Sequence, residues 1–230
     1  MSILSILITA VAPGAALLSY FYLKDRYDPE PISLVLRLFF FGVLIVFPVI
    51  VLQRAFMQGF GDHPFVFAFI SSSLPEEFMK WFIVYFVIFK HTNFDEPYDG
   101  IVYAVAVSLG FATLENVLYA LLNSMDFASL LMRAFLPVSG HAMFGVMMGY
   151  HFGRAKFDPN GSFKHLAMAF FLPFFWHGAF DYTLYAAKGY WIWFMVPLMV
   201  FLWLRSLLKV KRANAKSPLR MVTREDRIKI

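Results

Sequence analysis

Seven stretches of the sequence are each long and apolar enough to cross a lipid bilayer, which leaves the chain few possible folds. A transmembrane helix needs about 20 mainly apolar residues. The stretches that satisfy this are Ile3–Leu23, Ile32–Gln53, Pro64–Phe89, Gly100–Leu122, Leu130–Phe152, His165–Ala187 and Trp191–Leu208. We therefore predict an all-α, polytopic bundle of about seven transmembrane helices.

The composition supports this prediction. Of the 230 residues, 60% are hydrophobic and only 15% are charged, against about 25% charged in ordinary globular chains. The mean hydropathy is +0.65. The sequence contains no cysteine, which excludes disulfides, a thiol nucleophile and thiolate metal ligands.

Short connections rich in turn-forming residues join the seven stretches, as in Asp28-Pro29-Glu30-Pro31 and Asp158-Pro159-Asn160-Gly161. No linker separates a second domain and no internal repeat is present. We predict one transmembrane domain over residues 1–208 and a basic tail over residues 209–230. No basic residue precedes the first apolar stretch, so we interpret it as a retained anchor rather than a signal peptide.

Lysine and arginine are distributed unevenly between alternate connections, and this bias sets the orientation of membrane proteins. Three of the connections hold single basic residues, Arg54, Arg133 and Lys188. The others and the tail hold most of the rest: Lys24, Arg26, Lys90, Arg154, Lys156, Lys164, Lys209, Lys211, Arg212, Lys216 and Arg220. The C-terminus is therefore predicted to be cytoplasmic and the N-terminus outside. Topology and anionic lipid explain the basic tail, so nucleic acid is not an expected partner.

Few ionisable residues lie inside the stretches, and a charge at the bilayer centre costs about 2.5–3.5 kcal/mol, so such residues are functional candidates. They are Glu76, Glu77, Lys80, Glu115, His141, His177 and Asp181. At about 1.5 Å per residue, Glu76 lies roughly 18 Å from the outer end of its stretch, Glu115 and His141 roughly 12 Å, and His177 roughly 16 Å. Four helices should therefore bring their polar residues together in the middle to outer half of the membrane.

The spacing of residues along the predicted helices indicates which side chains share a face and where a helix is kinked or closely packed. Glu76 and Lys80 are four residues apart, as are His177 and Asp181, so each pair shares a helix face. Pro75 suits the first turn of a helix, and we expect the third helix to be kinked or restarted there. Gly145-x-x-x-Gly149 permits close approach of a neighbouring helix.

Adjacent carboxylates such as Glu76 and Glu77 cannot easily both ionise in a low dielectric, and one of such a pair suits the role of general base for a water molecule. A histidine held by Asp181, as His177 would be, can stabilise a developing oxyanion. These residues therefore fit hydrolysis of a peptide bond inside the membrane. A buried polar network that only orients the helices is the alternative, and it applies most readily to Glu115 and His141.

Other catalytic schemes fit less well. The zinc motif His-Glu-x-x-His and the serine motif Gly-x-Ser-x-Gly are both missing, although Glu76, His141 and His177 have the donor atoms to hold a metal. Gly59-Phe60-Gly61-Asp62 matches a Gly-x-Gly-Asp motif of intramembrane aspartyl proteases. However, Asp62 is predicted outside and its candidate partners, Asp28 and Asp99, inside, with about 30 Å of hydrocarbon between them.

A series of motifs resembles the PrsW family, in order and over nearly the whole chain. They are Tyr22-Leu-Lys-Asp-Arg-Tyr-Asp-Pro-Glu-Pro31, Glu76-Glu77-x-x-Lys80, Asp99-Gly-Ile-Val-Tyr103, Gly110-Phe-Ala-Thr-Leu-Glu-Asn116, His141 and His177-x-x-x-Asp181. The PrsW proteins are glutamic-type intramembrane proteases related to the CAAX prenyl-protein endopeptidases.

The resemblance implies a multi-pass protein of the bacterial cell membrane that makes the first (site-1) cleavage of a single-span anti-sigma factor. That cleavage leads to release of an extracytoplasmic-function sigma factor in a stress response. Glu76 and Glu77 match the family's essential glutamates and His177 its essential histidine. The wider family has Phe-x-x-x-His where this chain has Phe111-x-x-x-Glu115, which leaves open whether Glu115 or His141 takes the partner role. No cofactor is expected, since a carboxylate pair can activate water unaided.

Two other functions are compatible with buried acids and histidines. A proton- or cation-coupled transporter also places them at the midplane, but it would favour inverted repeats and paired discontinuous helices. A non-catalytic membrane scaffold is the second alternative. Retention of both glutamates together with His177 argues against the scaffold.

Overall fold

The computed structural model describes residues 2–123, 126–158 and 161–218, and they form helices joined by short loops, with no strand among them. The helical elements are α1 (Ile3–Tyr22), α2 (Ile32–Phe60), η1 (Val66–Ser73), α3 (Leu74–Ile83), η2 (Val84–Ile88), α4 (Asp99–Leu122), α5 (Phe127–Arg133), η3 (Ala134–Val138), α6 (Ser139–Phe157), α7 (Ser162–Ala186), η4 (Lys188–Tyr190) and α8 (Trp191–Asn214). The predicted all-α fold is confirmed.

Several elements follow one another without a break and form continuous rods. The elements η1, α3 and η2 make one rod over residues 66–88, and α5, η3 and α6 make another over residues 127–157. Over the described residues this gives seven rods at the places of the seven predicted stretches. Three are clearly longer than predicted. Helix α2 continues from Gln53 to Phe60, α8 continues from Leu208 to Asn214, and the rod of α5, η3 and α6 covers residues 127–157 rather than 130–152. Helix α8 thus includes the start of the predicted tail, of which residues 219–230 lie outside the described part.

Five of the helical segments are long and apolar enough to cross a membrane: residues 3–22, 32–60, 99–122, 127–157 and 191–214. The rods that contain α3 and α7 are the other two. They carry Glu76, Glu77, Lys80, His177 and Asp181, and an intramembrane ionisable group is a functional candidate.

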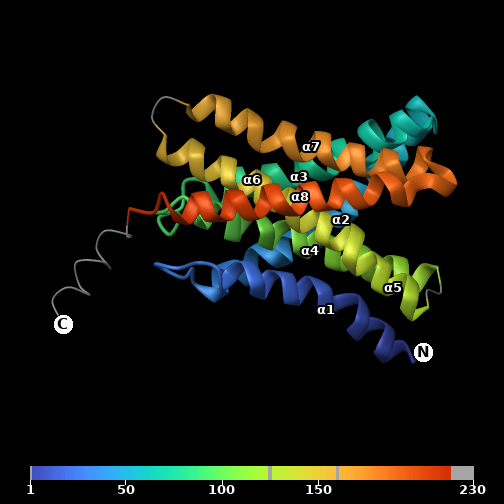
Figure 1. The fold of residues 1–230 in the computed structure, drawn as a ribbon, viewed down its shortest axis with the longest axis horizontal. Helices are drawn as coiled ribbons and strands as arrows, with labels where there is room; N and C mark the ends of the chain where they lie inside the picture. The colour runs from blue at the N-terminus through green and yellow to red at the C-terminus, as the bar shows by residue number, and fades with distance from the viewer. Residues whose placement is uncertain (1, 124–125, 159–160, 219–230) are drawn as a thin grey trace.

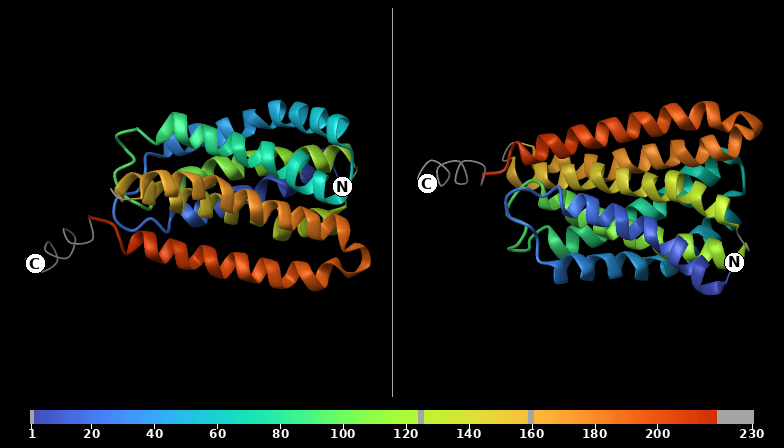
Figure 2. Two further views of the ribbon diagram at one scale, coloured as in Figure 1. Left: turned by 90° about the horizontal axis from the view of Figure 1, so that it is seen from above. Right: turned by 60° about the horizontal axis from the view of Figure 1, so that its bottom comes forward.

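Helices α4 and α6 lie at the centre of the bundle (Figures 1 and 2), where every residue of α4 from Asp99 to Thr113 and most residues of α6 are buried. Helices α1, α2 and α6 pack around α4, while α7 and α8 pack against α6. The outer helices expose large apolar side chains, among them Phe40, Phe47 and Phe194, which are each more than half exposed. A lipid bilayer would cover such a surface.

Glycines allow α4 and α6 to approach closely. A Cβ added to Gly149 would overlap the carbonyl oxygen of Gly100, and one added to Gly145 would lie 2.9 Å from the hydroxyl oxygen of Ser108. The predicted packing role of the Gly145-x-x-x-Gly149 pattern is therefore confirmed.

We expect Gly149→Ala to lower the melting temperature of the purified protein by several degrees, because α4 and α6 must separate to admit the methyl group. Gly59→Ala is the matched control, since a Cβ there meets no atom within 4 Å. Equal melting temperatures for the two variants would contradict the close approach at Gly149.

The rod formed by η1, α3 and η2 changes its hydrogen-bonding pattern at Pro75. A π-helix ends at Ser73 and α3 begins at Leu74, which places Pro75 in the first turn of the α-helix. Proline has no N–H and interrupts the hydrogen-bond ladder of a longer helix, and here it stands directly after the change of pattern. The predicted restart at Pro75 thus takes the form of a π-to-α transition within one rod, directly before Glu76 and Glu77.

Candidate active site

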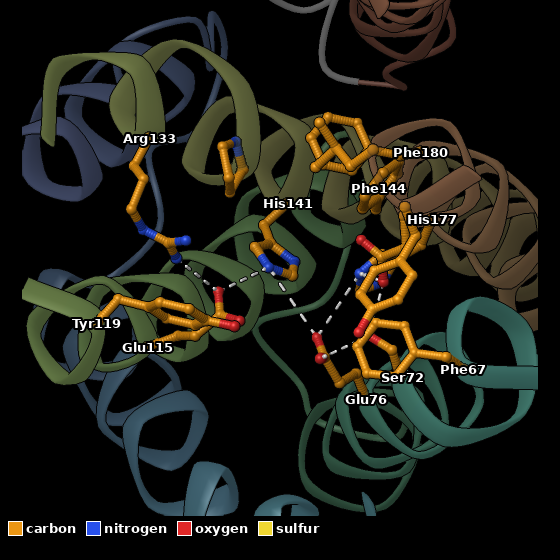
Figure 3. Close-up of a pocket in the computed structure, with 14 residues that line it drawn as sticks. Phe67, Ser72, Glu76, Glu115, Tyr119, Arg133, His141, Phe144, His177 and Phe180 are labelled. Atoms are coloured by element: carbon orange, nitrogen blue, oxygen red, sulfur yellow. Dashed lines mark hydrogen bonds and ion pairs between the residues drawn. The ribbon is translucent and has the colours of Figure 1, made fainter. Parts of the chain in front are cut away.

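The six residues predicted to form a site lie on four different rods and come together in the structure. Glu76 and Glu77 are on α3, Glu115 is on α4, His141 is on α6, and His177 and Asp181 are on α7. Figure 3 shows the side chains of Glu76, Glu115, His141 and His177 pointing toward one another. The prediction that four helices bring these polar residues close together in space is therefore confirmed.

The two adjacent glutamates have different surroundings. Glu76 lines a pocket of about 190 Å³ together with His141 and His177, whereas Glu77 does not line it and has no exposed surface. Successive residues of an α-helix point in directions about 100° apart, as 3.6 residues per turn require. Glu76 is therefore the carboxylate that a substrate or a water molecule can reach.

The ammonium group of Lys80 lies behind Glu76, among three partners. Its Nζ atom is 2.8 Å from Oε1 of Glu77, 3.4 Å from Oε2 of Glu76 and 3.0 Å from Nδ1 of His141. It also lies 4.3 Å from the centre of the Phe111 ring. Lys80 is fully buried, and burial of its charge is compensated by both carboxylates. Lys80 thus pairs with both glutamates, and not only with Glu76, which shares its helix face at four residues' spacing.

His141 has its tautomer set by this lysine. An ammonium group has no lone pair and can only donate, so Nδ1 of His141 accepts from Lys80 and Nε2 carries the ring proton. Nε2 lies 3.4 Å from Oε2 of Glu115 and 4.0 Å from Oε2 of Glu76. Arg133 in turn lies 3.5 Å from Glu115. His141 therefore presents an N–H group to the pocket.

His177 contacts Glu77 more closely than the aspartate predicted to orient it. Its Nδ1 lies 2.8 Å from Oε1 of Glu77, while its Nε2 lies 3.4 Å from Oδ2 of Asp181 and 3.9 Å from Oε2 of Glu76. The ring also stacks on Phe144 at 5.0 Å between centroids. Glu77 thus fixes the ring, and Nε2 faces Glu76 across the pocket.

Two residues of the site were missed in the sequence, and both bind Glu76. Gln53 donates from Nε2 to Oε1 of Glu76 at 2.9 Å, and the hydroxyl of Ser72 donates to Oδ2 of Asp181 at 2.6 Å and lies 3.5 Å from Glu76. Gln53 stood at the predicted end of an apolar stretch, where a polar residue is ordinary. Ser72 is one of three consecutive serines before Pro75, where the sequence indicates only a kink or restart of the helix.

The Gly-x-Gly-Asp motif does not take part in this site. Asp28 precedes α2 and Asp62 follows it, and α2 has 29 residues. At about 1.5 Å per residue the two carboxylates lie roughly 40 Å apart along the helix. They cannot form an aspartyl pair.

The donor atoms of the site would suit a metal ion. Glu76, Glu77, His141 and His177 are all buried, and each offers one ligand atom within 4.8 Å of the others. Imidazole and carboxylate are ordinary zinc ligands. In the arrangement described above, the ammonium group of Lys80 supplies the positive charge among these same atoms.

Comparison with known proteins shows which family and which proteins the chain is similar to. Residues 30–205 match the model of a family described as PrsW family intramembrane metalloprotease. The protease PrsW of Geobacillus kaustophilus is 53% identical over 211 residues, which are 91% of this chain and 92% of the relative. The protease PrsW of Bacillus subtilis is 46% identical over 92% of this chain and 96% of the relative, and that of Clostridioides difficile is 30% identical over 91% of each. No solved structure matches the chain.

Proposed function

Because the chain belongs to the PrsW family of intramembrane proteases, we propose that it makes the first cleavage in a membrane-anchored, single-span anti-sigma factor. The consequence of this cleavage would be activation of an extracytoplasmic-function sigma factor. The observation that carries the proposal is the pocket-facing carboxylate of Glu76, flanked by the Nε2 atoms of His141 and His177 at 4.0 and 3.9 Å.

Glu76 acts as the general base in this proposal. A water molecule beside Oε2 would lie within reach of both the carboxylate and the two imidazoles. Gln53 holds Oε1 from the opposite side, so Oε2 is the atom that takes the proton as the water attacks the peptide carbonyl. Oε2 then gives this proton to the peptide nitrogen as the C–N bond breaks and the amine leaves. A general base in such a position contributes about 10²–10⁴ to the rate.

The two histidines stabilise the oxyanion that forms on the carbonyl oxygen. His141 donates from Nε2, the nitrogen that Lys80 leaves protonated. His177 donates from Nε2 when both of its ring nitrogens carry protons, and in that form it has Glu77 at one nitrogen and Asp181 at the other. Donors that are already oriented need no rearrangement as charge develops.

Should a metal ion bind, Glu76, His141 and His177 would hold it, and it would acidify a bound water molecule and polarise the substrate carbonyl. The base and the donors assigned above already supply these functions.

We therefore expect cleavage to continue after the purified enzyme is treated with a strong chelator. The reason is that Lys80 provides positive charge beside the base and that His141 engages Lys80 through a ring nitrogen lone pair. A zinc protease treated in parallel verifies the chelation, and activity is measured at a temperature at which the chelated protein stays folded. Loss of activity that one divalent metal restores would replace this mechanism with a metal-dependent one.

We also propose that all seven rods cross the membrane, with the N-terminus outside and the C-terminus in the cytoplasm. Helix α1 begins and helix α8 ends at opposite ends of the bundle (Figure 1), as an odd number of crossings requires. A reporter enzyme that is active only in the cytoplasm should therefore be active when fused after Ile230. The same fusion is expected to be silent with a reporter that works only outside the cytoplasm, and the reverse pattern would refute the orientation.

Co-expression with candidate substrates tests the proposed function. A single-span anti-sigma factor tagged at its cytoplasmic end should yield a shortened, membrane-bound product when this chain is present. The product should be missing with the Glu76→Gln variant, which separates cleavage by this enzyme from cleavage by a host protease. If no single-span anti-sigma factor of the host organism is shortened, the proposed substrate class is wrong.

A further inference from the structure

A second cluster of buried acidic residues lies away from the candidate active site, where the loop between α1 and α2 meets the start of α4. Its members are Asp25 in that loop, Glu96 just before α4, and Asp99 at the first position of α4. Asp25 is 8% exposed, and Glu96 and Asp99 are fully buried. The loops that carry these residues lie at the same end of the bundle in both views of Figure 2. Asp99 and Glu115 are sixteen residues apart on α4, so roughly 24 Å separates the cluster from the active site.

Carboxylate oxygens of this cluster converge, and several of them are buried without a hydrogen-bond partner. One carboxylate oxygen of each residue lies within 4.8 Å of the others. Both oxygens of Asp25 and Oδ1 of Asp99 are buried without a hydrogen-bond partner. A buried polar atom that lacks a partner costs about 1–3 kcal/mol, and more when it is charged. Such atoms in a native structure require an explanation, and a bound ion is one that suits several converging carboxylates.

No basic side chain supplies that partner. In the part of the chain that the structure describes, Asp25, Glu96 and Asp99 form no ion pair with lysine, arginine or histidine. Lys156 is directed elsewhere, since its Nζ donates to the carbonyl oxygen of His91 at 3.0 Å and lies 4.6 Å from the centre of the Phe94 ring.

Hydrogen bonds from backbone amides and from two tyrosine hydroxyls hold the segments of this cluster in place. The amides of Asp95 and Glu96 donate to Oδ2 of Asp99 at 2.8 and 2.7 Å, which leaves Oδ1 free to face the other acids. On the neighbouring loop, the hydroxyl of Tyr22 donates to the carbonyl oxygen of Glu30 at 2.9 Å. The carboxylate of Glu30 accepts from the hydroxyl of Tyr103 on α4. Both segments that carry the acids are thus fixed before any ligand arrives.

We propose that Asp25, Glu96 and Asp99 bind one hard divalent cation, of the calcium or magnesium class, which ties the loop between α1 and α2 to the start of α4. The donor set consists of oxygen atoms alone, which such cations prefer and zinc and copper do not. The oxygens all lie within 4.8 Å of one another, close enough for one ion with metal–oxygen distances of about 2.0–2.6 Å to contact them together. The cation stabilises the fold at this end of the bundle and takes no part in peptide hydrolysis.

Direct binding of Mn²⁺, a paramagnetic substitute for both ions, tests the proposal. The purified, chelator-treated full chain in detergent is titrated with Mn²⁺ and the free ion is followed by electron paramagnetic resonance. We expect one site in the wild-type protein, with competition by Ca²⁺ or Mg²⁺. Asp25→Asn and Glu96→Gln should each weaken binding at least about tenfold, because the affinity of such sites follows the number of charged ligands. Asp28→Asn, an exposed acid of the same loop, is the matched control and should bind as the wild type does.

A second measurement separates this site from the active site and protects the test against variants that do not fold. The double variant Glu76→Gln, His177→Ala should keep the Mn²⁺ site, and Ca²⁺ or Mg²⁺ should raise its melting temperature as it does that of the wild type. The proposal is overturned if the wild-type protein binds no Mn²⁺ or if the active-site double variant loses the ion. It is equally overturned if acidification raises the melting temperature while no divalent cation does, since protons would then hold the carboxylates together.

Discussion

Replacing Glu76 with glutamine is expected to lower cleavage by about 10²–10⁴, the contribution of a well-placed general base. Glutamine has nearly the volume of glutamate and can still accept the hydrogen bond from Gln53, but its amide cannot take a proton from water. The measurement is the rate of appearance of the shortened substrate in detergent or in vesicles. The variant should insert into the membrane and melt cooperatively, as the wild type does.

Asp62→Asn provides the control for this change, because it makes the same conversion of carboxylate to amide at an exposed position after α2. Its activity should equal that of the wild type. Glu77→Gln should also reduce cleavage, but through a different cause, because Glu77 contacts Lys80 and His177 rather than the pocket. Wild-type turnover by the Glu76→Gln variant would remove this residue from the mechanism.

His177→Ala is expected to lower cleavage by about 10²–10³, the usual cost of losing one preorganised donor to an oxyanion. Substrate binding should be retained, because the ring faces Glu76 rather than the apolar walls that would hold a peptide. The effect should therefore appear in kcat and not in KM. Binding of a tagged substrate to the inactive variant can be measured by co-purification.

Asp181→Asn should be milder than His177→Ala. Asparagine can still accept the hydrogen bond from Ser72, which lies 2.6 Å from Asp181, and the ring of His177 keeps its closer partner, Glu77, at 2.8 Å. The opposite pattern would reverse the assignment. If Asp181→Asn were as inactive as His177→Ala while Glu76→Gln retained activity, His177 with Asp181 would be the base and the glutamates would be structural.

Much of the site followed from hydropathy and helical geometry alone. The cost of burying a charge singled out Glu76, Glu115, His141 and His177, and counting residues from the ends of apolar stretches placed them at similar depths. Long helices have a fixed rise per residue, so depth can be calculated without knowing how the helices pack. The structure brings these residues together as that calculation predicted.

The rotation of each helix about its own axis, and the side chains that each residue contacts, could not be predicted from the rise per residue. Which of Glu76 and Glu77 faces the pocket depends on how α3 is turned against α7, and the π-helical segment before it alters that turn. The interaction of Lys80 with His141 joins residues 61 positions apart, and that of Gln53 with Glu76 depends on the packing of α2 against α3. Such contacts leave no periodic pattern in a single sequence.

The π-helical hydrogen bonding of η1 gives the rod before Glu76 a reserve of length that its α-helical parts lack. A π-type bond spans one residue more than an α-type bond, so deleting a single residue between Val66 and Ser73 would let the rod continue as an ordinary α-helix. The residues after the deletion would keep their facing, and Glu76 would still point into the pocket. A deletion within α4 before Glu115 would instead rotate everything after it by about 100°. Homologous proteases should thus tolerate the loss of one residue in η1 better than the loss of one in α4.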